Sequence, residues 1–154
     1  MAVIGLISDT HGLLRPEAVR RLTGVDAIVH AGDIGDPGII EALRTLAPVT
    51  AIRGNIDRGG WARAYRETER LSVAGRTLYV LHDRKTLAID LVAEGIDVVI
   101  SGHSHVPKIE TAAGVLFINP GSAGRRRFKL PITVATLEIA AGEMRAEIHD
   151  LGVG

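Results

Sequence analysis

Cysteine is absent from this chain of 154 residues. Disulfide scaffolds, thiolate zinc sites and cysteine nucleophiles are therefore excluded, and any bound metal must take nitrogen and oxygen ligands. Aromatic residues make up only 3% of the chain, and its formal net charge is zero. Both deficits argue against a base-stacking platform and a broad electrostatic attraction for nucleic acid. We expect no nucleic-acid-binding surface, while a small anionic substrate stays open.

Long hydrophobic runs are also missing. No stretch approaches the roughly 20 apolar residues that a membrane-crossing helix needs, and the start Met1–Ile7 lacks the basic residues and the length of a signal peptide. We therefore expect a cytoplasmic protein with no membrane contact. The apolar share of 46% is high enough, at this length, to predict one folded domain over residues 1–154.

Short apolar runs rich in Val, Ile and Ala predict the strands of a parallel sheet. These runs are Ala2–Ile7, Ala27–Ala31, Val49–Ile52 and Val98–Ile100. Apolar residues at helical spacing follow Pro16, and a second such set comprises Ile39, Leu43 and Leu46. The first third of the chain is therefore predicted to alternate strand, helix, strand, helix, strand.

The second half is predicted to be mostly β-structure. Three turns that contain Ala-Gly separate paired apolar segments, and each predicts a β-hairpin. The pairs are Leu71–Val73 with Thr77–Leu81, Lys108–Thr111 with Val115–Ile118, and Ile132–Ile139 with Met144–His149. Leu87 and Leu91 predict a helix that leads into the strand Asp97–Ile100. The alternation along the last segment places His149 toward solvent, so we exclude His149 from any site.

Polar residues of the kinds that bind metals follow the apolar runs at once. The clusters are Asp9-Thr10-His11, Gly32-Asp33, Gly54-Asn55 and Gly102-His103-Ser104-His105. Each is weak alone, because Gly-Asp and Gly-Asn are ordinary turn pairs. The carboxyl ends of parallel strands meet at one edge of a sheet, so the four clusters are expected to converge. Together they predict a site for two metal ions.

The same clusters, with the lone His82, Val106-Pro107 and Ile118–Ser122, resemble the calcineurin-like metallophosphoesterase superfamily. The resemblance extends over nearly the whole chain and is specific to the small bacterial and archaeal YfcE-like phosphodiesterase branch. It implies an α/β fold with two packed mixed β-sheets flanked by helices, a four-layer α-β-β-α sandwich. It also implies that a small phosphate diester is hydrolysed by attack of a metal-bridging hydroxide.

The resemblance implies a specific division of the ligands. One metal is held by Asp9, His11 and His105, a second by Asn55, His82 and His103, and Asp33 bridges the two. A carboxylate can donate to two cations at once, which supports Asp33 as the bridge. Four of these residues, Asp33, Asn55, His103 and His105, are expected to take part directly in catalysis. Manganese is expected by resemblance, with iron, nickel and zinc as alternatives that the same donor atoms accept.

Two positions depart from the family pattern. Many members carry a histidine directly after the metal-binding Asn, placed to protonate the leaving oxygen, whereas Ile56 stands here. Diesters and aryl esters, which have stable leaving groups, are therefore expected to react better than alkyl monoesters. His82 is followed by Asp83-Arg84-Lys85 rather than by glycine. A strand-terminal histidine capped by backbone stays an alternative for His82, and Asp83 is a candidate hydrogen-bond acceptor for it.

Several other polar residues have both a structural and a functional interpretation. His30 is expected to be a hydrogen-bonded core residue, and Asn119 to shape a turn with Pro120 and Gly121. Asp57 fits a solvated turn and an acceptor for a ligand histidine equally well. Arg125–Arg127 are candidates for binding a phosphate, and Trp61 for stacking on a ring, against the simpler role of solvated surface.

Two other functions stay open at this point. A phosphomonoesterase or nucleotide hydrolase uses the same two-metal machinery, and a fold does not choose between such substrates. A non-catalytic protein-interaction scaffold is the other, since a retromer subunit resembles this branch and has a weakened metal site. The complete set of ligand-competent side chains argues against the scaffold. The physiological substrate, the native metal and assembly as a homo-oligomer are left open.

Overall fold

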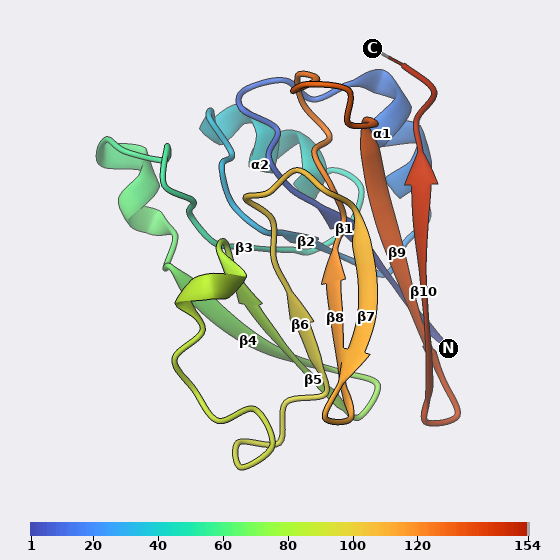
Figure 1. Cartoon of the computed structure of the whole chain (residues 1–154). Coiled ribbons are helices and arrows are strands. Elements are labelled where there is room, and N and C mark those ends of the chain that lie inside the picture. Colours follow the sequence, from blue (N-terminus) through green and yellow to red (C-terminus); the bar gives the residue numbers. More distant parts are fainter. Residues whose placement is uncertain (154) are drawn as a thin grey trace.

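Two β-sheets packed face to face form the centre of the fold (Figure 1). The computed structural model describes residues 1–153. The first sheet has the order β10-β9-β1-β2-β3 and consists of β1 (Ala2–Ile7), β2 (Ala27–His30), β3 (Val49–Ala51), β9 (Thr133–Ala140) and β10 (Glu143–Asp150). β1, β2 and β3 are parallel to one another, whereas β9 is antiparallel to both β1 and β10.

The second sheet has the order β4-β5-β6-β8-β7. Its strands are β4 (Thr68–Val73), β5 (Arg76–Leu81), β6 (Val98–Ile100), β7 (Lys108–Ala112) and β8 (Val115–Asn119). β5, β6 and β8 are parallel, with an antiparallel strand at each edge. In the three hairpins, Ala74, Ala113 and Ala141 have positive φ and each precedes a glycine that also has positive φ. Both central residues of a type I′ turn have positive φ, which suits the twist of the strands.

Two α-helices cover the outer face of the first sheet, as Figure 1 shows. α1 (Pro16–Leu22) and α2 (Pro37–Arg44) both begin at a proline, whose missing N–H would have no partner in a first turn. The side chain of Asp36 caps α2 by accepting a hydrogen bond from the N–H of Gly38 at 2.7 Å. No helix within residues 1–153 is long and apolar enough to cross a lipid bilayer.

The main core lies between the sheets. It is built from fully buried apolar side chains of both sheets, among them Leu6, Val29, Leu78, Ile100 and Leu137. Successive residues of a strand point to opposite faces, so Leu6 faces the second sheet while Ile7 packs toward the helices. Each such side chain contributes about 1.5–3 kcal/mol by burial. This packing holds the two sheets in a fixed orientation, and with them the loops that follow their strands.

The predicted α/β fold class is confirmed, and the strands and hairpins lie where the sequence places them, within a few residues. The predicted helix at Leu87 and Leu91 is wrong. A short 3₁₀ turn, η2 (Arg84–Thr86), is followed by an irregular segment in which Leu87, Ile89 and Leu91 pack against the outer face of the second sheet. Apolar residues at every second position suit an extended segment, and this segment, not a helix, forms the outermost layer on that side.

Candidate metal centre

The predicted clusters meet at the carboxyl ends of β1, β2, β3, β5 and β6. Backbone hydrogen bonds join the loops that follow these strands. The N–H of Asp9 donates to the carbonyl of Gly32 at 3.0 Å, and the N–H of His11 donates to that of Asp33 at 2.9 Å. The N–H of Gly102 donates to the carbonyl of His82 at 2.9 Å. These bonds tie together the loops of each sheet, and the N–H of His103, which donates to Oδ2 of Asp9 at 3.1 Å, joins the loops of one sheet to those of the other.

One group of ligand-type atoms comes from Asp9, His11 and His105, whose atoms lie within 4.8 Å of one another. The carboxylate of Asp9 is fully buried, and its Oδ2 accepts hydrogen bonds from the hydroxyl of Ser8 at 2.8 Å and from the N–H of His103 at 3.1 Å. Its Oδ1 lies 3.5 Å from Nε2 of His105 and 3.9 Å from Nε2 of His11. These are the three residues assigned to one metal from the sequence.

A second group, Asp9, Asp33 and His82, is equally close. Nε2 of His82 lies 3.2 Å from Oδ2 of Asp33 and 3.8 Å from Oδ1 of Asp9. Oδ2 of Asp33 also lies 3.5 Å from Nε2 of His11. Both carboxylates therefore lie between His11 and His82, and either one has the position that a bridging carboxylate requires.

Asn55 and His103 lie at the outer side of this arrangement. Their side chains are exposed, and both line a cavity of about 430 Å³ that is also lined by His82. The rings of His82 and His103 are 5.2 Å apart, nearly perpendicular. Nε2 of His103 lies 3.8 Å from Oδ2 of Asp83. The structure thus brings Asn55 and His103 to the same cavity as His82, in a looser arrangement than that of the two carboxylates.

Buried polar atoms without hydrogen-bond partners mark the centre of the site. Within residues 1–153 these side-chain atoms are Oδ1 of Asp9, Nε2 of His11, Nε2 of His82 and Nδ1 of His105. A buried polar group left without a partner costs about 1–3 kcal/mol. Oδ1 of Asp9 lies 3.9 Å from Nε2 of His11 and 3.8 Å from Nε2 of His82. Carboxylate oxygens and imidazole nitrogens directed at one point fit divalent cations well.

The hydrogen bonds of His82 leave one ring nitrogen for a metal. Its Nδ1 lies 2.7 Å from the carbonyl oxygen of Ala31, which can only accept, so Nδ1 carries the proton and Nε2 faces the two aspartates. The expected partner, Asp83, makes no hydrogen bond to His82, and its side chain caps η2 at the N–H of Lys85. The backbone therefore takes the orienting role that was considered for Asp83.

The charges of the centre perturb one another. Burial disfavours the charged forms of Asp33 and His82, but the 3.2 Å approach of the Asp33 carboxylate to the His82 ring, which favours opposite charges on the two groups, outweighs burial. The pKa of the Asp33 carboxyl is consequently lowered, and the pKa of the His82 imidazole is raised. For His105, burial lowers the pKa, and the positive charge of Arg127 acts in the same direction.

The backbone is strained at the candidate ligands. Nine non-glycine residues of the described chain have positive φ, and five of them are Asp9, His11, Asp33, His103 and His105, with φ between 47° and 70°. This left-handed region is uncommon for residues with a side chain, and such strain is concentrated at functional sites. The fold holds these side chains in directions that relaxed loops would not give them.

Glycines let the loops approach the carboxylates closely. A Cβ atom on Gly54 would lie 2.1 Å from Oδ1 of Asp33, and one on Gly102 would lie 2.1 Å from the hydroxyl of Ser8 and 2.6 Å from Oδ2 of Asp9. The glycines of Gly54-Asn55 and Gly102-His103 thus have a steric role, which their residue type alone could not separate from an ordinary turn.

We expect Gly54→Ala to displace the Asp33 carboxylate. The added methyl group would overlap both the carboxylate and the backbone N of Asp33, so the loops of Asp33 and Gly54 must move apart. A displacement near 1 Å should lower kcat/KM for a phosphate diester about 100-fold, and the overpacking should cost about 1–3 kcal/mol of stability. Gly60→Ala is the matched control, since a Cβ there meets nothing within 4 Å. Equal kinetics for the two variants would contradict the steric role.

The structure shows the roles of two further residues. His30 is a buried core residue, as expected, whose Nε2 lies 3.0 Å from the Thr10 hydroxyl and whose Nδ1 accepts from the Gly32 N–H at 3.1 Å. Asn119 shapes the turn to Gly121, as expected, and also donates to the carbonyl of Gly102 at 2.9 Å. It therefore braces the loop that carries His103 and His105.

Asp57 has a role that neither sequence interpretation described. It is buried, and its carboxylate accepts three backbone hydrogen bonds, from Ile34 at 3.0 Å, Gly35 at 2.9 Å and Gly54 at 2.8 Å. These N–H groups belong to the loops that carry Asp33 and Asn55. Asp57 thus fixes the two loops relative to each other without contacting a ligand histidine.

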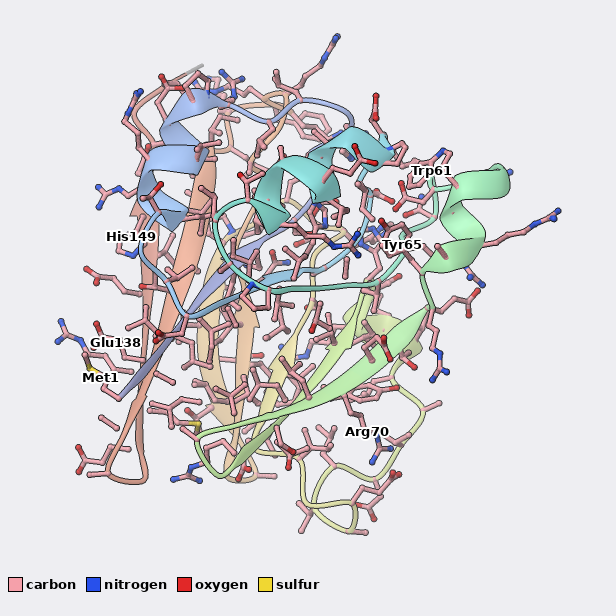
Figure 2. The ribbon with its side chains drawn as sticks, turned by 180° about the vertical axis from the view of Figure 1, so that it is seen from behind. Met1, Trp61, Tyr65, Arg70, Glu138 and His149 are labelled. Carbon is pink, nitrogen blue, oxygen red and sulfur yellow. The ribbon has the colours of Figure 1, made fainter. Side chains whose placement is uncertain are left out.

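The remaining candidates lie at different distances from the centre. Arg125, Arg126 and Arg127 line a cavity of about 220 Å³ together with His11 and His105. Trp61 instead packs edge-on against Tyr65, with ring centroids 6.2 Å apart, and against the apolar cluster under α2. Figure 2 shows both rings beside η1 (Gly60–Ala64), with His149 on β10 at the opposite side of the molecule. The arginines stay candidates for substrate contact, whereas Trp61 has a packing role.

Comparison with known proteins gives consistent matches. The sequence model of the calcineurin-like phosphoesterase superfamily domain matches residues 2–142. A probable metallophosphoesterase of Methanothermobacter thermautotrophicus is 37% identical, covering 97% of this chain and 93% of the relative. The structure of an archaeal phosphodiesterase superimposes with a TM-score of 0.78 at 25% identity, over 96% of this chain and 99% of that one. Zinc-complexed Vps29 of Entamoeba histolytica shares the fold, with a TM-score of 0.73 at 24% identity over 97% and 99% of the chains.

Proposed function

The chain belongs to the calcineurin-like phosphoesterase superfamily, and we propose that it hydrolyses phosphate diesters with two divalent metal ions. One observation carries the proposal. Buried Oδ1 of Asp9, Nε2 of His11 and Nε2 of His82 lack hydrogen-bond partners and converge beside Asp33. Diester specificity is supported by the similarity to an archaeal phosphodiesterase. It is also supported by Ile56, which stands directly after Asn55 and cannot protonate a leaving group.

We assign the ligands as the resemblance implies. Asp9, His11 and His105 would hold one ion, Asn55, His82 and His103 the other, and Asp33 would bridge them. Two bound cations supply a water of lowered pKa and polarise the phosphoryl oxygens of the substrate. Manganese suits this mixture of carboxylate, amide and imidazole donors, and iron, nickel and zinc suit it as well.

The protein's own groups orient the ligand atoms. The N–H of Ile56 donates to Oδ1 of Asp33 at 3.1 Å, which directs Oδ2 toward His11 and His82. The N–H of His103 and the hydroxyl of Ser8 fix Oδ2 of Asp9 and turn its Oδ1 to the histidines. These partners act before substrate binds, so the site needs little rearrangement when the substrate arrives.

The leaving group must depart without help from residue 56. The side chain of Ile56 is 42% exposed and carries no proton to donate. Placing an imidazole there by Ile56→His should raise the kcat/KM ratio of alkyl monoesters to aryl diesters by about 100-fold, the usual lower range for a positioned general acid. Val92→His, at an exposed apolar position in the turn before β6, serves as the control. An unchanged ratio would mean that another group or water protonates the leaving oxygen.

A substrate panel tests the proposed specificity. Metal-stripped protein, reloaded with manganese, should hydrolyse bis(p-nitrophenyl) phosphate faster than p-nitrophenyl phosphate, and both faster than an alkyl monoester. The opposite order, with monoesters preferred, would identify a phosphomonoesterase. The fold itself does not separate an enzyme from the scaffold considered above, because Vps29 shares it. The complete and converging ligand set favours the enzyme.

A further inference from the structure

A second cavity, of about 390 Å³, adjoins the candidate metal centre. It borders the 430 Å³ cavity that Asn55 and His82 line. The two cavities share Asp83 and His103 in their linings, and these side chains approach within 3.8 Å. A phosphate held at the metals, beside His103, would therefore border both cavities.

The second cavity combines an apolar floor with cationic walls. Phe117, Ile118 and Val106 supply the apolar surface, and Arg84, Lys85 and Lys108 supply the positive charge, against a single acid, Asp83. The first cavity is lined by one arginine, Arg53, and two acids, Glu67 and Asp83. An anionic group is therefore favoured in the second cavity and not in the first.

Arg84 is held in a fixed position in this wall. Its guanidinium lies over the ring of Phe117, 3.9 Å from the centroid, and forms an ion pair with Glu110. Glu110 also pairs with Lys108 at 3.4 Å. Among residues 1–153, Lys85 has no acidic partner within 4.0 Å. A planar guanidinium fixed in this way can stack on a ring, and the lysines can bind a phosphate.

We infer that the second cavity binds a ring-bearing phosphate group of the substrate, of the nucleoside monophosphate class. The inference rests on the proposed diesterase function, because only a diester has a second ester group to place in the second cavity. The volume suits one ring system rather than a chain of them. The ring stacks on Arg84, and the additional phosphate lies between Lys85 and Lys108.

Binding of adenosine monophosphate to metal-free protein, measured by calorimetry in the presence of a chelator, tests the inference without catalysis. Adenosine and inorganic phosphate are measured alongside it, and each should bind at least about tenfold more weakly, because each makes only part of the contacts. Lys85→Gln with Lys108→Gln should raise the dissociation constant for the nucleotide at least about tenfold by removing both phosphate contacts.

Arg44→Gln with Lys129→Gln is the charge-matched control. Both residues are exposed and lie outside this cavity. Their substitution removes two positive charges, as the substitution of Lys85 and Lys108 does. Arg84→Met should weaken nucleotide and adenosine binding and spare phosphate binding. Nucleotide binding no tighter than that of phosphate, or equal weakening by the control pair, would overturn the inference. Tight nucleotide binding in a protein that turns over no diester would instead overturn the proposed function and retain the nucleotide site.

Discussion

Asp33→Ala is expected to abolish metal-dependent turnover of bis(p-nitrophenyl) phosphate, with a loss on the order of 10³-fold in kcat/KM. Oδ2 of Asp33 lies within 3.5 Å of Nε2 of both His11 and His82, so its carboxylate is placed to serve both proposed metals. A neutral side chain cannot offset the repulsion between two cations there. Metal analysis of the purified variant should accordingly find at most one tightly bound ion per chain.

Asp36→Ala is the control for this result. It removes a carboxylate from the same loop, at an exposed position whose role is to cap α2. Its loss should cost about 1 kcal/mol of stability and leave turnover unchanged. If Asp33→Ala kept about a tenth or more of wild-type turnover, the bridging role would be wrong, because losses at residues that act as a unit are far larger.

The second large effect concerns stability and pH. Complete burial lowers the pKa of His30 from 6.5 to about 4. Between these values the unfolded chain binds a proton at His30 and the folded chain does not, so stability falls as pH falls through this window. The difference of roughly 2.5 units corresponds to about 3 kcal/mol at 1.36 kcal/mol per unit. The stabilisation is complete above pH 6.5 and lost near pH 4.

His30→Asn isolates this contribution. In the wild type, the N–H of Gly32 donates to Nδ1 of His30. The side-chain oxygen of asparagine can accept the same hydrogen bond, but asparagine has no group that titrates in this pH range. Urea unfolding of both metal-free proteins should give the wild type the larger free energy of unfolding at pH 7.5. The difference in free energy between the two proteins should shrink by about 3 kcal/mol toward pH 4. A difference in free energy that is constant with pH would show that the pKa of His30 is the same in the folded and the unfolded protein.

Much of the site was predictable because each candidate ligand follows a strand directly. Asp9, Asp33 and Asn55 come after β1, β2 and β3, and the order of parallel strands brings their ends together. Family membership, including the small branch, was readable from the same clusters and is confirmed by the comparisons. Local sequence was sufficient here because chain direction and strand ends decide the geometry.

What the sequence could not give depends on partners from distant loops. Asp57 fitted a solvated turn and an acceptor for a ligand histidine equally well, because its three actual donors, in Ile34, Gly35 and Gly54, become its neighbours only in the fold. The orienting partner of His82 is likewise a backbone carbonyl, that of Ala31, which no residue type announces.

The predicted helix at Leu87 failed for a different reason. Leu87 and Leu91 have helical spacing, but Ile89 between them is also packed against the second sheet. Asp90 then starts a single turn, accepting the N–H of Ala93 at 3.1 Å, and Gly95, with φ of 70°, ends it. The same apolar residues fit both periods, and the contacts with the sheet decide between them.

The most direct test of the central claim is manganese titration of metal-stripped protein, with bound metal and hydrolysis of bis(p-nitrophenyl) phosphate followed together. We expect no turnover without metal, and turnover that rises to its maximum as two ions bind per chain. Turnover by metal-free protein, or full activity with no bound metal at Asp9, Asp33 and the facing histidines, would contradict it.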